Sequence, residues 1–118
     1  MIAVIFELWP AEGRAEDYFA LAGALKSKLE AIDGFISVER FASITEPGKF
    51  VSISFWRDEE AVRQWRNNAE HRAAQDAGRN GIFRDYRLRV AAVLRDYGIA
   101  DRSGAPARKS RDRGENEG

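Results

Sequence analysis

Hydrophobic residues along this chain alternate between the spacing of a strand and the spacing of a helix, and their order restricts the fold. Residues 2–9 (IAVIFELW) are rich in β-branched and aromatic side chains and are followed by Pro10, which predicts a strand. Residues 13–34 place apolar side chains at helical spacing and end in Gly34, which predicts an amphipathic helix of about five turns. The apolar positions of this helix are Tyr18, Ala22, Leu25, Leu29 and Ile32.

The next part of the sequence predicts a hairpin. Residues 35–45 (FISVERFASIT) and 49–57 (KFVSISFWR) have the composition of strands, and the EPG sequence between them is a turn signal. Nearer the C-terminus, residues 82–98 alternate Tyr, Leu, Val and Ala with Arg, Ala and Val, which predicts a long final strand.

A second helix is predicted between the hairpin and the final strand. Asp58 is a residue type that caps helix N-termini, and Trp65 lies on the apolar face of the segment that follows. We expect Asn67 and Asn68 to interrupt this helix. Asn67, with Glu70 three residues later, could cap a second helical segment.

The predicted order is therefore βαββαβ, which is typical of a ferredoxin-like α+β fold. In that fold a four-stranded antiparallel sheet carries both helices on one face. The other face is expected to need a partner as well, because the first strand is apolar on both sides. One side holds Ile2, Val4, Phe6 and Leu8, and the other holds Ala3, Ile5 and Trp9. A second copy of the chain would cover the second apolar face, so the pattern predicts a homodimer.

The last twenty residues have a different composition. Residues 99–118 mix Arg, Asp, Gly, Ser and Pro with almost no large apolar side chain. Such a segment buries too little surface to offset the entropy of ordering it, which predicts a flexible charged tail. The folded domain is then expected to span residues 1–98.

Composition excludes several kinds of chemistry. The chain has no cysteine and a single histidine, His71, so disulfides, thiolate metal sites and a multi-histidine site within one subunit are ruled out. Nineteen basic residues balance nineteen acidic ones, which disfavours nucleic acid as a partner. The longest apolar run is too short to span a membrane or form a signal peptide. We therefore expect a cytoplasmic protein that binds neither nucleic acid nor membrane.

With this order and length, the stretch SFWRDEEAVRQWRNNAEHRAAQDAGRNGIFRDYRLRVAAVLRDYG resembles the antibiotic biosynthesis monooxygenase family, whose members are dimeric α+β barrel proteins. The resemblance covers roughly residues 1–98 and is strongest at Phe55 and Trp56, at AVRQW ending in Trp65, and at EHRAAQ. It implies a pocket between sheet and helices in each subunit. It also implies oxygen insertion into aromatic or quinol-type substrates without metal or flavin.

A related branch of the family degrades heme, and its pattern is matched only in part. That branch needs Asn on the first strand, Trp on the second helical segment, and an iron-binding His about ten residues after the Trp. Trp65 matches the Trp, whereas Gln75 stands at the ligand position and Glu7 at the strand position. His71 lies one helical turn before the ligand position. Heme is therefore the alternative cofactor, with His71 as a shifted ligand.

The cofactor-independent branch depends on a dry pocket, a base and hydrogen-bond donors for an anion of the substrate. The resemblance suggests Trp65 as a wall of the pocket and His71 as base or donor. Gln75 would be a polar anchor, and Arg87 or Arg89 a charge partner for a phenolate.

Each candidate also has a structural interpretation. Trp65 could be part of the core, and His71 could pair on a helix surface. Arg87 and Arg89 could form the solvent side of a strand. Glu7, a further candidate for substrate binding, sits between Phe6 and Leu8 and needs a partner, for which an arginine on the adjacent strand is suited. The functional alternative is a stress-response dimer that holds a small apolar ligand without turnover.

Overall fold

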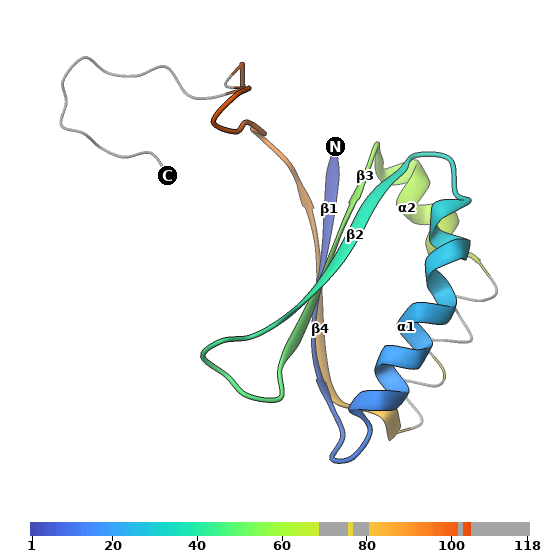
Figure 1. The fold of residues 1–118 in the computed structure, drawn as a ribbon. Coiled ribbons are helices and arrows are strands. Elements are labelled where there is room, and N and C mark those ends of the chain that lie inside the picture. The colour runs from blue at the N-terminus through green and yellow to red at the C-terminus, as the bar shows by residue number, and fades with distance from the viewer. Residues whose placement is uncertain (69–75, 77–80, 102, 105–118) are drawn as a thin grey trace, which may run out of the picture.

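The computed structural model describes residues 1–68, 76, 81–101 and 103–104. Its elements confirm the predicted βαββαβ order. They are β1 (Ile2–Pro10), α1 (Ala15–Glu30), β2 (Phe35–Ala42), β3 (Phe50–Trp56), α2 (Glu59–Arg66) and β4 (Phe83–Ala92). The strands form one sheet in the order β2-β3-β1-β4, and all neighbouring strands are antiparallel. This is the ferredoxin-like arrangement (Figure 1).

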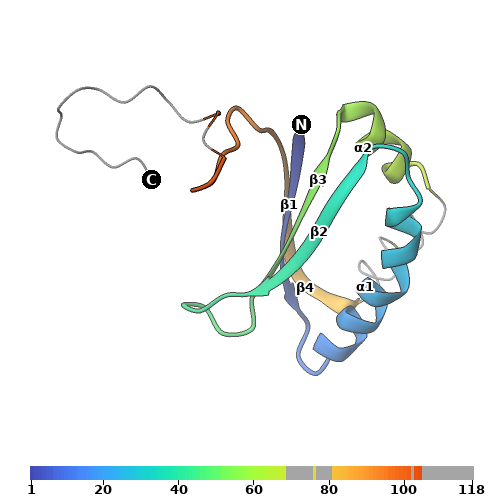
Figure 2. The same cartoon turned by 45° about the horizontal axis from the view of Figure 1, so that its top comes forward.

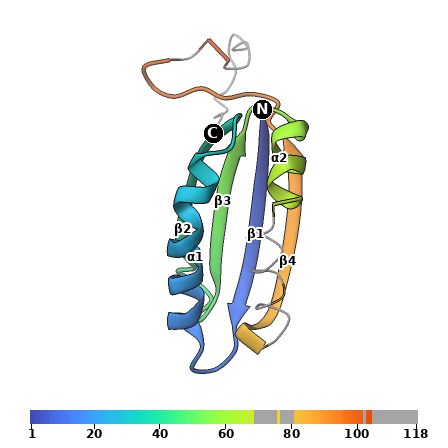
Figure 3. The ribbon, with the colours of Figure 1, turned by 90° about the vertical axis from the view of Figure 1, so that its right-hand side faces the viewer.

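Both helices lie on the same face of the sheet, as Figures 1 and 3 show from two directions. No described helix covers the opposite face. The turn between β2 and β3 bends away from the helices (Figure 2). Trp9 holds this turn against β1, because its indole N–H donates to Glu46 at 2.8 Å. Within the described residues, no helix is long and apolar enough to cross a bilayer.

The start and end of α2 agree with the sequence. The Asp58 carboxylate accepts a hydrogen bond from the backbone N–H of Ala61 at 3.0 Å, which confirms it as the N-cap. The helix ends at Arg66 and has Asn67 as its C-cap, which confirms the predicted interruption. The second helical segment is expected from this point on, but Glu70 lies outside the described residues.

Helix α1 is shorter than predicted, because it ends at Glu30 rather than near Gly34. The next residues form tight turns, in which the N–H of Ile32 donates to the carbonyl of Leu29 at 3.1 Å. Gly34 follows with φ = +95°, a conformation that disfavours residues with a side chain. It still acts as the stop signal between the helix and β2.

Strand β4 ends at Ala92, so the prediction of a strand through residue 98 is wrong at its C-terminal end. Ala92 pairs with Ile2, and the N–H of Val93 donates to the carbonyl of Met1 at 3.0 Å. Strand β1 itself begins at Ile2, so its ladder with β4 ends here. The alternation of apolar residues therefore continues past Ala92, where the hydrogen-bond ladder between β1 and β4 ends.

The core lies between the sheet and the helices in two clusters. One contains Leu8, Tyr18, Ala22 and Ile82. The other contains Leu29, Trp56, Ala61 and Val62. Trp56 and Leu8 have no solvent exposure. Residues of both clusters border a space that separates them, and this space is the candidate site.

Candidate active site

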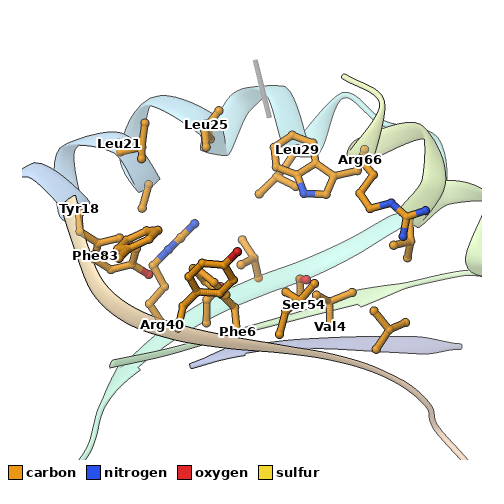
Figure 4. A pocket seen from close by; sticks show the side chains of 18 residues that line it. Val4, Phe6, Tyr18, Leu21, Leu25, Leu29, Arg40, Ser54, Arg66 and Phe83 are labelled. Carbon is orange, nitrogen blue, oxygen red and sulfur yellow. The ribbon is translucent and has the colours of Figure 1, made fainter. Parts of the chain in front are cut away.

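A cavity of about 250 Å³ lies between the helix-bearing face of the sheet and the two helices (Figure 4). Strand alternation determines which side chains reach it, because every second residue of a strand points to the same face. On β1 these residues are Val4 and Phe6, and on β4 they include Leu88 and Val90. The apolar lining is completed by Leu21, Ala22, Leu25, Leu29, Val38, Val62 and Phe83. The cavity therefore offers a mostly apolar environment.

Tyr18 and Arg40 form a polar pair within this apolar lining. Arg40 extends from β2 toward Tyr18 on α1 (Figure 4). The Tyr18 hydroxyl and the Arg40 Nε are both buried, and neither has a hydrogen-bond partner among the described residues. Burial raises the pKa of the Tyr18 phenol, and the charge and N–H groups of Arg40 oppose that shift only in part. Tyr18 is therefore a neutral hydroxyl donor at neutral pH.

Two serines of β3 contribute polar groups to the sheet side of the cavity. Ser52 and Ser54 both line it, and Ser54 is buried. The Ser54 hydroxyl accepts a hydrogen bond from the Trp56 indole N–H at 2.9 Å. This bond satisfies the one polar atom of a fully buried tryptophan side chain.

The α2 end of the cavity is formed by Trp65 and Arg66. Trp65 stacks on Trp56, with ring centroids 6.4 Å apart and planes inclined by 28°. Trp65 thus packs against the core with one side and borders the cavity as well, so both interpretations from the sequence apply. Arg66 is exposed and lies at the opposite end of the site from Arg40 in Figure 4.

The other predicted site residues do not gather at this cavity. His71 and Gln75 lie outside the described residues. Glu7 and Arg89 belong to the opposite face of the sheet, where the two side chains pair at 3.1 Å. Arg87 pairs with Glu7 in the register of β1 and β4, so it lies on that opposite face too.

The partner predicted for Glu7 is confirmed by Arg89. Lys49 also approaches Glu7, at 3.7 Å, and lies over the Trp9 ring at 5.1 Å from its centroid. The hydrogen bond from Arg89 holds the pKa of Glu7 below its usual value, and Lys49 adds to the effect against the opposing influence of burial. This charge cluster lies on what we call the open face, which also carries Ala3, Ile5, Val51, Ile53 and Phe55.

The pattern of the heme-degrading branch is met in the described residues by Trp65 alone. Glu7, at the strand position, belongs to the face that lies away from the cavity. The described residues contain no group of three or more His, Cys, Asp or Glu side chains that could hold a metal ion. The ligand position, Gln75, lies outside them.

Arg40 and Tyr18 form the buried polar pair of the cavity, and the sequence alone did not single out either as a site residue. The helical spacing places Tyr18 on the apolar face of its helix, which is correct but gives no hint of a role for its hydroxyl. For Arg40 the available signal was its spacing from Val38, since residues two apart on a strand share a face. An arginine that shares a face with a core valine is a candidate for a buried polar role.

Comparison with known proteins supports the fold and identifies the family. A family model described as antibiotic biosynthesis monooxygenase matches residues 1–77. A protein of Pyricularia oryzae named jasmonate monooxygenase ABM is 45% identical over 93 residues, which are 79% of this chain and 43% of that protein. The chain thus spans less than half the length of this relative.

Solved structures show the same fold at low sequence identity. Rv0793 from Mycobacterium tuberculosis has a TM-score of 0.74 at 22% identity, covering 82% of this chain and 98% of that one. SnoaB from Streptomyces nogalater, described as a cofactor-independent oxygenase, has a TM-score of 0.68 at 12% identity, covering 80% and 95%. With its βαββαβ fold and the family match over residues 1–77, the chain belongs to the antibiotic biosynthesis monooxygenase family.

Proposed function

We propose that this protein is a cofactor-independent monooxygenase that oxidises an electron-rich aromatic or quinol-type substrate in the cavity between sheet and helices. The observation that carries the proposal is the cavity itself. It is mostly apolar and contains a buried hydroxyl and a buried guanidinium nitrogen that have no hydrogen-bond partner among the described residues. Such a combination fits an apolar ring with an oxygen substituent.

The chemistry needs no external reductant when the substrate supplies the electrons. A CH₂ group beside an aromatic ring or carbonyl loses a proton, and the resulting carbanion reacts with O₂ to form a peroxide at that carbon. Loss of water from the peroxide leaves a C=O group, so that one oxygen atom enters the product and the other leaves as water. The protein's part is to bind the anion, exclude water and hold donors toward the developing charge.

Named residues have distinct parts in this proposal. Trp65 forms a wall, and the Tyr18 hydroxyl with Arg40 donates to the substrate oxygen. His71 remains the proposed base, because a histidine with an ordinary pKa near 6.5 can take up a proton at neutral pH. Gln75 remains a proposed polar anchor. Glu7, Arg87 and Arg89 lie on the open face, so Arg40 takes over the role of charge partner for a phenolate.

Oxygen uptake with anthrone and with dihydroxynaphthalene quinols tests the activity. We expect the protein to accelerate uptake and, with anthrone in isotopically labelled O₂, to place one labelled atom in the product. Trp65→Phe and His71→Ala should reduce kcat/KM, by about a hundredfold if His71 is the base. Arg63→Met is the matched control, since Arg63 is exposed and pairs with Glu60 away from the cavity. Equal rates of oxygen uptake in the wild type and the three variants would contradict the proposal. A wild-type rate no higher than the rate without protein would contradict it as well.

A second candidate substrate is favoured by the 45% identity to the relative named jasmonate monooxygenase. We propose a cyclopentanone fatty acid of the jasmonate type as this alternative. By the same CH₂ oxidation, incubation with jasmonate under oxygen should then give a product in which one oxygen atom has replaced two hydrogen atoms, as detected by mass spectrometry. Turnover of anthrone with no change in jasmonate would exclude this alternative and leave the first proposal standing.

We further propose that the protein acts as a homodimer joined through the open face. The apolar side chains of this face include Ile5, Val51, Ile53 and Phe55, and no described helix covers them. A contiguous apolar surface of this kind on a folded domain marks an interaction site. The dimer would cover it while the cavities remain on the outer sides of the two sheets.

A further inference from the structure

We propose that the cavity selects substrates that enter it as organic anions, with a carboxylate or a stabilised enolate bound between Arg40 and Tyr18. The inference rests on the proposed function in taking this cavity as the substrate site. It adds that the substrate is already an anion when it enters the cavity, before any proton is removed there.

The first support is the balance of charge around the cavity. Its described lining contains two cations, Arg40 and Arg66, and no carboxylate. The other polar side chains in that lining are hydroxyl groups and an indole, namely Tyr18, Ser52, Ser54, Tyr86 and Trp65. A low-dielectric space bordered by positive charge attracts an anion and disfavours a cation.

The second support is that Arg40 differs from other arginines of the fold. Arg57 pairs with Asp33 and Asp58, both at 3.1 Å, and Arg89 pairs with Glu7 at the same distance. Arg40 has no such carboxylate among the described residues, although its Nε is buried. Arg40 as a whole is half-buried, and a guanidinium nitrogen that is buried without a partner is costly for the protein, so its presence is explained if a ligand supplies the negative charge.

Geometry adds a second donor to the same place. The Tyr18 side chain is only 4% exposed, and its buried hydroxyl lies near Arg40 at the edge of the cavity (Figure 4). A carboxylate or enolate has two oxygen lone-pair directions in one plane, which match a planar guanidinium and a neighbouring hydroxyl. The apolar walls then hold the body of the ligand.

Calorimetric titration with pairs of matched ligands tests the inference without any turnover. The first pair is 2-naphthoate and neutral 2-naphthamide, and the second is the enolate of 2-phenyl-1,3-indandione and neutral 2-phenylindene. We expect the protein to bind at least one anion about tenfold or more tightly than its neutral partner, because hydrogen bonds to charged groups are the stronger ones. Which anion shows the preference distinguishes a carboxylate from an enolate.

Arg40→Met should reduce that affinity ratio toward one, and Tyr18→Phe should weaken anion binding by a smaller factor. Arg63→Met, the same substitution at an exposed position outside the cavity, should keep the wild-type ratio. Thermal unfolding supplies the second measurement. Arg40→Met should melt at the wild-type temperature or above it, since it removes a buried Nε that has no partner among the described residues, whereas a structural arginine would lower the melting temperature when replaced.

Equal affinity of the wild type for both members of each pair would overturn the inference, and so would an unchanged ratio in Arg40→Met. If Arg40→Met does not fold, the wild-type ratios and Tyr18→Phe decide the matter alone. Failure of the oxygenase proposal looks different. If the protein prefers anions but consumes no oxygen, the anion site stands and the oxygenase proposal fails. If it oxidises neutral quinols and shows no preference for anions, the oxygenase proposal stands and the anion site fails.

Discussion

Asp58 joins two structural roles in one side chain. Its carboxylate caps α2 through the N–H of Ala61 and forms an ion pair with Arg57 at 3.1 Å. The hydrogen bond from Ala61, followed by that from Arg57, holds the pKa of Asp58 below its usual value of 3.8. Because α2 has only eight residues, its first turn depends strongly on this cap.

Replacing Asp58 by Ala should lower the melting temperature by a few degrees, as expected for loss of an N-cap in a small domain. The part due to the carboxylate charge is fully present above pH 3.8 and is lost as the pH falls through the lower folded-state pKa. Asp58→Asn is the matched control, because Asn caps well and does not titrate. Thermal melts from pH 7 to pH 2 should show wild type and Asp58→Asn converging in acid. A difference in melting temperature between the wild type and Asp58→Asn that stays constant over this pH range would contradict the role given to the carboxylate charge.

At the level of residues, the sequence predicts a role correctly where the adjacent residues in the chain determine it. Asp58 before a helical pattern and Glu7 between two apolar residues both led to correct partners. Arg40 was missed because β2 has apolar side chains on both faces, including Val38 and Phe41, so alternation alone did not say which face was buried. An irregularity in register between Phe35 and Ser37 blurs the pattern further.

Gly34 connects three elements, since it lies between α1 and β2 and is in contact with α2. A Cβ atom at this position would come within 2.7 Å of the Ala61 Cβ, and the backbone has φ = +95°. Its carbonyl also accepts a hydrogen bond from the N–H of Arg57 at 2.7 Å. The position therefore requires glycine for two separate reasons, a backbone conformation and a close approach.

Gly34→Ala should destabilise the fold more than Gly48→Ala. Gly48 also has positive φ, at +84°, but a Cβ atom there would meet nothing within 4 Å, so it isolates the conformational cost of about 1 kcal/mol. We expect Gly34→Ala to cost about 2–4 kcal/mol, because overpacking adds to the same conformational cost. Urea denaturation measures both values. Ala61→Gly in the Gly34→Ala background should recover the packing part, and an equal cost at the two glycines would contradict this explanation.

At the level of elements, order and type could be predicted because each segment had a clear period and its own stop signal. The ends could not always be predicted, since the extent of a strand depends on its neighbour. Residues 93–98 continue the composition of β4, yet the ladder between β1 and β4 ends where Ala92 pairs with Ile2. The order of strands in the sheet followed from the fold class and not from any single residue.

The whole molecule has one covered and one uncovered sheet face. The open face combines the apolar side chains of Ile5, Val51, Ile53 and Phe55 with Glu39, Arg87 and the cluster of Glu7, Arg89 and Lys49. The turn between β2 and β3 bends toward the side of this face (Figures 1 and 2). Ile44 in this turn is 98% exposed. These features make the proposed homodimer testable by single substitutions.

Ile53→Asp should convert the proposed dimer into a monomer, because it places a charge among the apolar residues at the centre of the open face. Ala24→Asp introduces the same charge at an exposed position of α1, on the opposite side of the sheet, and should leave the dimer intact. Size-exclusion chromatography with light scattering at micromolar concentration measures both, and circular dichroism verifies folding. A monomeric wild type, or a dimeric Ile53→Asp protein, would exclude the open face as the interface.

The alternation of β1 has a consequence for how such a protein can diverge. Val4 and Phe6 border the cavity, whereas Ile5 and Glu7, between and beside them, belong to the open face. Neighbouring residues of this strand therefore serve different purposes under the proposed function. One set would contact the ligand in the cavity, and the other set forms part of the open face. Under the proposed function, substitutions at even-numbered positions of β1 would change the substrate preference, whereas substitutions at odd-numbered positions would change the proposed dimer contact.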